Sequence, residues 1–414
     1  MMNPNTMNIR TRKSLALLLL ATLTACESSD LPIQHADSYD YITFSARTEQ
    51  RTTRTNPYVN YDPEKHPGTM GVFGYYDIDQ YNASTASQTV KTPNPIFDNT
   101  TLTYNTSTQA WDYENPKKWN DYKGAQAFDF FAYMPIAKGT KLTRSETEAA
   151  SNNTYTLTIP FTIPSATTTS GSSSSSASTS TSASPLFFDV KQAPIICATP
   201  VHRQATDASG KELAFERVIN LQFDQTLTAY NLQFMLDKTM SAIRQFRIKG
   251  VTLSGELATS GTISRTYTWN KDGKQEWTAG DIQWTNLSKK NFSATDIPIP
   301  YKESTDKASD NNTKTVIVNN DGYTPWGDTF YVIPDQDFHP TISVTYDTEF
   351  LDQNGETVVT RKEVTSIIVL NKDNFDKLVT TETAIIHPIR ILIQPRYLYV
   401  LTDQDAYTGH LLVE

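Results

Sequence analysis

Tyr39-Asp-Tyr-Ile-Thr-Phe-Ser-Ala46 is the stretch of sequence that decides the fold class, because its side chains alternate between two faces. Ile42, Phe44 and Ala46 fall on one face, and more polar residues fall on the other. A period of two with β-branched and aromatic residues is typical of a β-strand that buries one face. We therefore predict a strand over residues 39–46, with Ile42, Phe44 and Ala46 facing a core.

The residues before this strand have the pattern of an export signal. An apolar stretch from Leu15 to Leu23, too short to span a bilayer as a helix, follows three basic residues, Arg10, Arg12 and Lys13. Its last part, Leu23-Thr-Ala-Cys26, resembles the lipobox of bacterial lipoproteins, in which the cysteine carries the lipid. We predict a lipoprotein signal peptide over residues 1–25, a palmitate-bearing Cys26 that anchors the chain in a membrane, and a polar tether over residues 26–38. A plain signal peptide with a chance cysteine is the alternative.

Composition and charge indicate a globular exported protein that does not bind nucleic acid. Of the 414 residues, 38% are hydrophobic and 20% are charged, and the mean hydropathy is -0.47. The net charge is -9, and the chain lacks the clusters of Lys and Arg that nucleic acids and anionic membranes attract. If Cys26 carries lipid, Cys197 has no disulfide partner. We expect Cys197 to be a small buried side chain.

A polar segment with three arginines follows the first strand. Residues 47–55 include Arg47, Arg51 and Arg54 and no apolar residue that a core would bury. Segments of this kind run over the surface, where proteases reach them. We therefore predict an exposed loop here.

Most of the remaining chain also has strand-like patterns. Met70 to Tyr76 is apolar and aromatic with two glycines, which indicates a buried strand with close backbone approach. Three turn pairs between strand-like runs predict antiparallel hairpins: Asp272-Gly273, Asp321-Gly322 and Asn354-Gly355. The one segment with helical character is Asn374 to Val379. The other predicted strands are 101–105, 111–114, 127–134, 155–163, 217–223, 231–236, 246–253, 262–269, 316–318, 329–333, 341–350, 357–370 and 384–394.

A low-complexity segment and the length of the chain define the predicted domains. Residues 167–184 contain only Ser, Thr, Ala and Gly, which cannot offset their ordering entropy by burial. We predict a disordered insertion in a surface loop, because residues 185–190 resemble one more strand of the same domain; an interdomain linker is the alternative. The polar stretch 202–211 separates an N-terminal domain over 39–210 from a C-terminal domain over 211–414. The predicted fold class is mainly β: two tandem β-sandwich-like (transthyretin-like) domains with few short helices.

The sequence has no residues with catalytic or metal-binding spacing. Its six histidines are scattered singly, and zinc-protease, phosphate-loop, dinucleotide and nucleophile-elbow motifs are missing. Two aspartate pairs have too few neighbouring ligands for calcium and are interpreted as solvated turns: Asp77 with Asp79, and Asp403 with Asp405. Trp111 and Trp119 either pack a β core, the preferred interpretation, or stack on sugar rings. We predict a protein that is not an enzyme and uses no metal or cofactor.

Several stretches resemble a known family when they are taken in order along the chain. Besides the lipobox, they are residues 41–45 (YITFS), 71–76 (GVFGYY), 111–113 (WDY), 128–135 (FDFFAYMP), 218–223 (VINLQF), 249–255 (KGVTLSG), 330–336 (FYVIPDQ) and 342–346 (ISVTY). Together they resemble the fimbrillin family, the lipoprotein-derived subunits of fimbriae in Gram-negative anaerobes, which includes the Mfa-like subunits.

The resemblance implies a route of maturation and assembly. Family subunits reach the outer membrane as lipoproteins, and an arginine-specific protease then cuts the loop after the first strand. Loss of that strand opens an apolar groove that a strand of another subunit fills. On this chain the displaced strand is 39–46, and the side chains that leave the groove are Ile42, Phe44 and Ala46. The candidate cut sites are Arg47, Arg51 and Arg54.

Two hypotheses for the function follow. The first is a structural subunit of a surface fimbrium with a role in adhesion, whose partners are other subunits, the protease and a host or bacterial surface ligand. Stalk, tip and base positions stay open, because residues 397–401 and 411–413 form either a closing hairpin or donor segments. The second is an outer-membrane glycan-binding lipoprotein, which the aromatic content also fits. A surface loop that is never cut is the alternative to processing.

Overall fold

The computed structural model describes most of the chain after the predicted tether. The described residues are 40–48, 68–77, 94–145, 152–164, 186, 192–207, 209–241, 243–270, 276–297, 316–318, 322–335, 337–370, 386–395 and 411–413. Tyr41–Glu414 form one compact unit. The predicted signal peptide, Cys26, the tether, the insertion 167–184 and the helix 374–379 lie outside the described residues.

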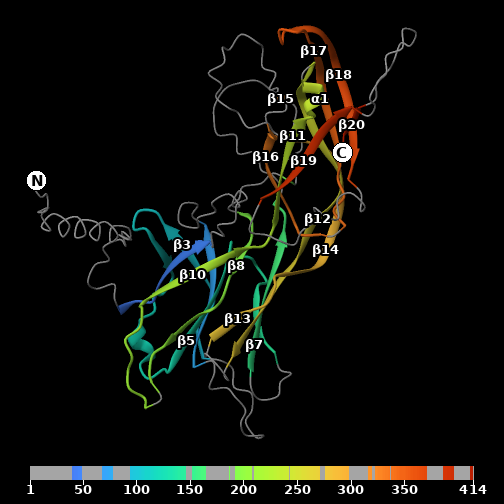
Figure 1. Cartoon of the computed structure of the whole chain (residues 1–414). Helices are drawn as coiled ribbons and strands as arrows, with labels where there is room; N and C mark the ends of the chain where they lie inside the picture. Colours follow the sequence, from blue (N-terminus) through green and yellow to red (C-terminus); the bar gives the residue numbers. More distant parts are fainter. Residues whose placement is uncertain are drawn as a thin grey trace, which may run out of the picture. The chain divides into compact units, whose positions relative to one another are not determined.

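Strands dominate the described residues, as predicted (Figure 1). The strand nearest the N terminus lies at one edge of the first sheet. Across this sheet lie β1 (Thr43–Thr48), β10 (Val218–Gln225), β8 (Ile195–Cys197), β5 (Ala127–Met134), β2 (Thr69–Tyr76), β3 (Asn94–Asn105) and β4 (Ala110–Tyr113). A further strand pairs with β5, namely β9 (Val201–Gln204). The pair of β1 with β10 is parallel, and the other pairs are antiparallel.

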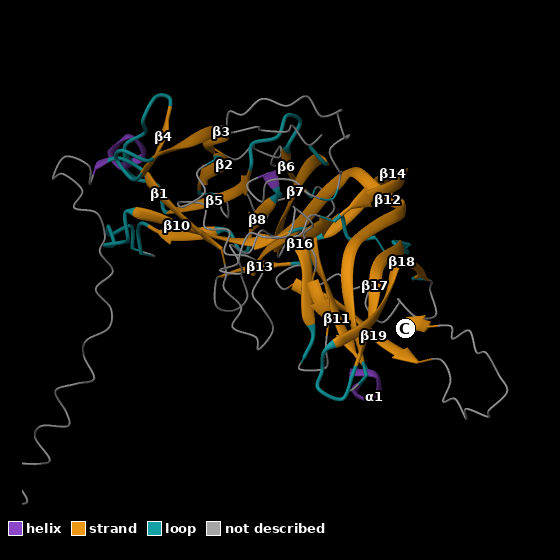
Figure 2. Ribbon diagram, turned by 90° about the horizontal axis from the view of Figure 1, so that it is seen from above, coloured by secondary structure: helices purple, strands orange, loops and turns teal. Residues whose placement is uncertain are grey.

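Two further sheets hold the other strands (Figure 2). The second sheet contains β18 (Thr357–Val369), β17 (Thr341–Leu351), β12 (Arg244–Asn270), β7 (Asn152–Thr162) and β6 (Lys141–Arg144), with β13 (Glu276–Ala279), β14 (Gln283–Asp296) and β15 (Val316–Val318) paired to β12. The third sheet contains β16 (Thr324–Val332), β11 (Thr228–Leu236), β19 (Ile386–Pro395) and β20 (Leu411–Val413).

The buried side chains form two cores. The first core lies between the first sheet and β7, β13 and the C-terminal half of β12, which contributes Ile263 and Tyr267. The second core lies between the third sheet, β17 and the N-terminal half of β12, which contributes Phe246 and Ile248. This arrangement of sheets around two cores confirms the predicted mainly β fold class. The boundary at residue 210 stays a prediction; β10, which follows it, belongs to the first sheet.

The most informative difference from the predicted strands concerns β12. The predicted strands 246–253 and 262–269 are parts of this one strand, which runs through residues 254–261, most of which are polar residues or glycines. The ladder continues there because β14 supplies backbone partners, with register shifts such as that between Leu253 and Gly255. Sequence patterning did not predict β14, whose outward side chains are largely polar.

Short elements depend on single polar side chains. The one α-helix among the described residues is α1 (Lys238–Ser241), where Asp237 Oδ1 accepts a hydrogen bond from the Thr239 backbone N–H at 2.8 Å.

In the described part of the chain, no helix is long and apolar enough to cross a membrane. The predicted turn at Asn354-Gly355 does join β17 to β18, with Gly355 at φ 81°. Within the predicted strand 185–190, only Leu186 is described, in a turn and fully buried.

Candidate functional site

The candidate site is the place that β1 occupies at the edge of the first sheet. β1 pairs with β10 in a parallel ladder that sets Phe44 opposite Ile219 and Ala46 opposite Leu221. The strand differs from the prediction at both ends. Arg47 and Thr48, predicted as loop, continue the ladder with β10. At the other end, Tyr41 makes an isolated bridge with Lys118, outside the ladder.

The inward face of β1 is apolar and completely covered. Phe44 and Ala46 in β1, and Ile42 directly before it, have 5%, 0% and 0% of their surface exposed, which confirms that they face a core. The Phe44 ring lies 5.5 Å from the ring of Phe97 and 5.9 Å from that of Phe130, in edge-on contacts. Burial of a phenylalanine side chain of this kind stabilises by roughly 1.5–3 kcal/mol. Loss of β1 therefore uncovers a substantial apolar bed.

A second set of contacts holds the N-terminal end of β1, and we call residues 113–118 the clasp. The Ile42 backbone N–H donates to the Lys117 carbonyl at 2.9 Å. The Tyr113 hydroxyl donates to the Ile42 carbonyl at 2.8 Å and accepts from the Lys117 N–H at 3.2 Å. Burial raises the pKa of Tyr113 to about 12, so the phenol keeps its donor proton at neutral pH. Because Tyr113 belongs to β4, the clasp ties β1 to the opposite end of the sheet.

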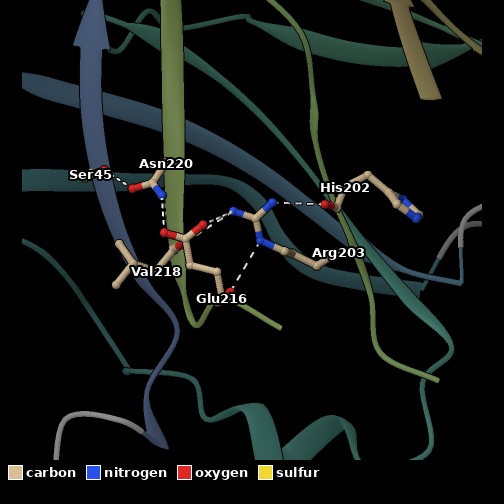
Figure 3. A network of polar contacts seen from close by, with 6 residues as sticks. All are labelled: Ser45, His202, Arg203, Glu216, Val218 and Asn220. Atoms are coloured by element: carbon tan, nitrogen blue, oxygen red, sulfur yellow. Dashed lines mark hydrogen bonds and ion pairs between the residues drawn. The ribbon is translucent and has the colours of Figure 1, made fainter. Parts of the chain in front are cut away.

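The outward face of β1 meets a polar network (Figure 3). Ser45 Oγ donates to Asn220 Oδ1 at 2.6 Å, and Asn220 Nδ2 donates to Glu216 Oε1 at 2.6 Å. Glu216 Oε2 lies 3.2 Å from an Arg203 guanidinium nitrogen. Arg203 also donates to the carbonyls of Glu216, His202 and Val218. We call Asn220, Glu216 and Arg203 the Asn220 network.

The guanidinium of Arg203 is the fixed end of this network. Its side chain is 19% exposed, whereas the side chain of Glu216 is 60% exposed. Burial lowers the pKa of Arg203 from its ordinary value, and the charge of Glu216 opposes that shift. Three backbone carbonyls and one carboxylate therefore hold the guanidinium in one orientation.

The neighbouring His202 side chain belongs to a separate structural cluster in the first core. His202 Nδ1 lies 2.8 Å from Asp129 Oδ1, which also accepts the indole N–H of Trp277 at 2.7 Å. The His202 ring packs against Trp269 with centroids 4.4 Å apart. These contacts join β5 and β9 to β12 and β13 and support the strand that carries Arg203.

The residues predicted to be functional have different positions. Arg47 is exposed, but its backbone is paired in the ladder opposite Gln222. Cys26, Arg51 and Arg54 lie outside the described residues. Their roles, and the role of Ile42, Phe44 and Ala46 as a displaced strand, stay predictions.

Other residues singled out in the sequence have structural surroundings. Trp111 and Trp119 are each 4% exposed and belong to the first core, as the preferred interpretation predicted. Asp77 accepts the backbone N–H groups of Gln126 and Ala127 and lies in a bend at φ 54°. Among the described residues, no group of three potential ligands could hold a metal ion.

Cys197 is fully buried, as predicted. Its Sγ lies 3.2 Å from the Tyr267 hydroxyl, and burial raises the pKa of the thiol. Thiolate formation is therefore disfavoured, as expected of an inert structural cysteine.

Sequence reasoning missed the partners of β1. Asn220 lies 175 residues from Ser45, and Tyr113 lies 71 residues from Ile42. Parallel pairing between distant segments leaves no local pattern, because neither a turn nor a fixed spacing joins the two strands. The polar residue between Ile219 and Leu221 was the one available signal, and it marks only an outward face.

No protein-family model matches the chain, and no curated protein matches it. Among solved structures, the chain is similar to a fimbrial protein from Bacteroides vulgatus, at 16% identity and a TM-score of 0.41, with 91% of this chain and 99% of that chain covered. It is also similar to a fimbrial anchor protein from Porphyromonas gingivalis, at 9% identity and a TM-score of 0.24, with 90% and 96% covered.

Proposed function

We propose that this chain is a non-catalytic structural subunit of a surface fimbrium that reaches the outer membrane as a lipoprotein and assembles by strand exchange. An arginine-specific protease cuts the segment after β1, the anchor at Cys26 and β1 leave together, and a strand of another subunit replaces β1. The observation that supports this proposal is the position of β1. It is an edge strand with one ladder partner among the described strands, and its apolar side chains belong to the first core.

Cutting the chain changes the binding of β1 from an intramolecular to an intermolecular equilibrium. Before the cut, the connection to β2 keeps the local concentration of β1 high, so that competing strands are excluded. After the cut, β1 is a separate peptide that binds with a finite dissociation constant, so it is lost when its concentration falls below that constant. The empty bed exposes apolar side chains and the free backbone groups of β10, and both favour capture of another strand.

The ladder also ranks the three candidate cut sites. The bond after Arg47 lies in the parallel ladder, because both Arg47 and Thr48 pair with β10. A protease needs an extended and accessible backbone, so a cut there requires β1 to open first. We therefore expect cutting after Arg51 or Arg54 to precede cutting after Arg47.

The test is treatment of the purified full chain with an arginine-specific protease, followed by mass spectrometry and electron microscopy. The expected result is a cut after Arg51 or Arg54, an otherwise intact body and filaments that appear only after cutting. The double variant Arg51→Lys, Arg54→Lys keeps only the paired Arg47 site, so it should be cut far more slowly than the natural chain and form filaments correspondingly late, whereas the matched variant Arg47→Lys should behave like the natural chain. Filaments without cutting, or cutting that unfolds the body, would contradict the proposal.

The glycan-binding hypothesis has less support from the described residues. The two tryptophans that could have stacked on sugar rings, Trp111 and Trp119, are buried in the first core instead. This hypothesis would be supported if the protein bound a polysaccharide and lost that binding when an exposed aromatic side chain was replaced.

A further inference from the structure

The outward face of the β1 bed carries a polar residue whose hydrogen-bonding direction is fixed. Asn220 is exposed on β10, and its side-chain amide contacts two groups. One is the hydroxyl of Ser45 on β1, which donates to the amide, and the other is the carboxylate of Glu216, which accepts from it. A carboxylate can only accept hydrogen bonds, so Glu216 accepts a hydrogen bond from the amide N–H₂ of Asn220. The carbonyl oxygen of the amide therefore points at β1 and offers an acceptor.

We propose that the Asn220 network selects the incoming strand, by requiring a hydroxyl donor at the position that Ser45 occupies. This inference rests on the proposed strand exchange and specifies the partner of the same site. The preferred partner strand carries a serine or threonine there, runs parallel to β10, and places an aromatic residue before the hydroxyl and a small residue after it.

The apolar bed supplies the other two parts of the preference. The pocket for Phe44 is lined by the rings of Phe97, Tyr113 and Phe130, and a small side chain would leave it unfilled. Ala46 is 0% exposed opposite Leu221, and a larger side chain would overpack this position. An aromatic residue, a hydroxyl residue and a small residue in succession therefore fit the bed in one register.

Arg203 keeps the network in this state. Its contacts to three backbone carbonyls fix the guanidinium, which in turn holds Glu216 beside Asn220 (Figure 3). Without the carboxylate, the Asn220 amide could rotate and present its N–H₂ to the strand, and the preference for a donor would be lost. A carboxylate in place of Ser45 meets an acceptor in Asn220 and the charge of Glu216 nearby, so acidic strands are rejected.

The test uses the full chain after arginine-specific cutting and fluorescent ten-residue peptides with the sequence of Tyr39–Thr48. Four peptides are compared by anisotropy: the natural one, Ser45→Thr, Ser45→Ala and Ser45→Asp. The natural and threonine peptides should bind within about twofold of each other, and the alanine peptide about fivefold more weakly, as expected for one hydrogen bond. The aspartate peptide should bind at least about tenfold more weakly.

A charge-reversing variant of the acceptor sharpens the test. Asn220→Lys offers a donor and a positive charge from an exposed position, so it should prefer the aspartate peptide over the natural one. The matched control is Gln222→Lys, which adds the same charge two residues further along the outward face. It should retain the preference for serine over aspartate.

The outcomes separate this inference from the proposed function. If the natural peptide enters but the four peptides bind alike, or if both lysine variants behave alike, the selection by Asn220 is overturned while strand exchange stands. If the natural peptide does not enter the cut protein at all, strand exchange and the selection fail together.

Discussion

Two strand pairs among the described residues are parallel, β1 with β10 and β11 with β19, and the strands β1 and β19 differ in their positions within the sheets. β10 and β11 are consecutive strands, and each pairs with a strand from one end of the described chain. β1 lies at the edge of its sheet, whereas β19 lies between β11 and β20. Both strands direct apolar side chains into a core, so burial alone does not show which strand can be exchanged. Their positions in the sheets differ in the way that the proposed exchange requires, because removal of an edge strand leaves the other ladders intact.

Removal of each terminal strand tests the comparison most directly and has the largest expected effect. A chain that begins at Glu49 loses β1 but keeps the other ladders of the first sheet, so it should stay folded with a lower Tm. A chain that ends at Leu370 loses β19 and β20, and with them the buried side chains of Ile389, Ile391 and Ile393 in the second core, so it should not fold. Circular dichroism melting and solubility measure both results. The opposite order of stability would contradict the comparison.

Single large-to-small substitutions in the two strands give the next largest effect. Phe44→Ala should destabilise the docking of β1 by about 3–5 kcal/mol, and Ile391→Ala should cost about 2–5 kcal/mol. The two losses differ in kind, because opening of β1 is a local event and opening of β19 disrupts the second core. In a background of Arg51→Lys, Arg54→Lys, where Arg47 is the remaining site of the segment, cutting after Arg47 should therefore accelerate by about a hundredfold or more in Phe44→Ala, since each 1.4 kcal/mol is a factor of ten.

The matched control for this measurement is Ile391→Ala under the same limiting protease concentration. It should lower the Tm without exposing the bond after Arg47 more than global unfolding does. Equal acceleration in both variants would show that β1 opens only when the whole unit unfolds.

Removal of one hydroxyl from the clasp should have a smaller effect, with a distinctive pH dependence. Tyr113→Phe loses the hydrogen bonds to Ile42 and Lys117, which should cost about 1–2 kcal/mol at neutral pH. The pKa of Tyr113 rises from 10.0 in the unfolded chain to about 12 in the folded one, because of burial. Between pH 10 and 12 the unfolded state binds fewer protons than the folded state, so stability falls as the pH rises.

The alkaline loss of stability should therefore be shallower in Tyr113→Phe than in the natural chain, as measured by urea unfolding at several pH values. Tyr75→Phe is the control, because burial and then Asp98 raise its pKa to about 12 as well. Tyr75 does not contact β1 through the clasp, so its variant should change the alkaline slope without releasing β1. Identical release of β1 in both variants would show that the clasp does not hold this strand.

The comparison also shows which parts of the structure the sequence can predict. The alternation of apolar and polar residues predicted the strand near Phe44 and the burial of Ile42 and Phe44. The glycines of β2 predicted that other groups approach its backbone closely, and a Cβ on Gly71 would indeed lie 2.3 Å from the Tyr133 ring. Such signals are local, since a period of two reflects one buried face.

Parallel pairing, the clasp and the Asn220 network depend on segments far apart in the chain, and no local pattern encodes them. The length of β12 was missed for a related reason. The middle of β12, mostly polar residues and glycines, pairs through its backbone with β14, and hydrophobic patterning does not register such bonds. The sequence thus predicts the strand at the candidate site and its buried face, but not the residues that hold it.

A second edge strand provides the smallest and most discriminating test. β18 also lies at an edge, but Ile367 and Val369 on it are 68% and 57% exposed, so its outward apolar side chains do not fill a core. Ile367→Thr should therefore change the free energy of unfolding by no more than about 0.5 kcal/mol. Ile42→Thr, the same substitution at a position with 0% exposure, should destabilise β1 clearly, because it buries a hydroxyl in the first core. If the two threonine variants unfold at the same urea concentration, an edge position alone governs these strands, and the buried row of β1 loses its special role.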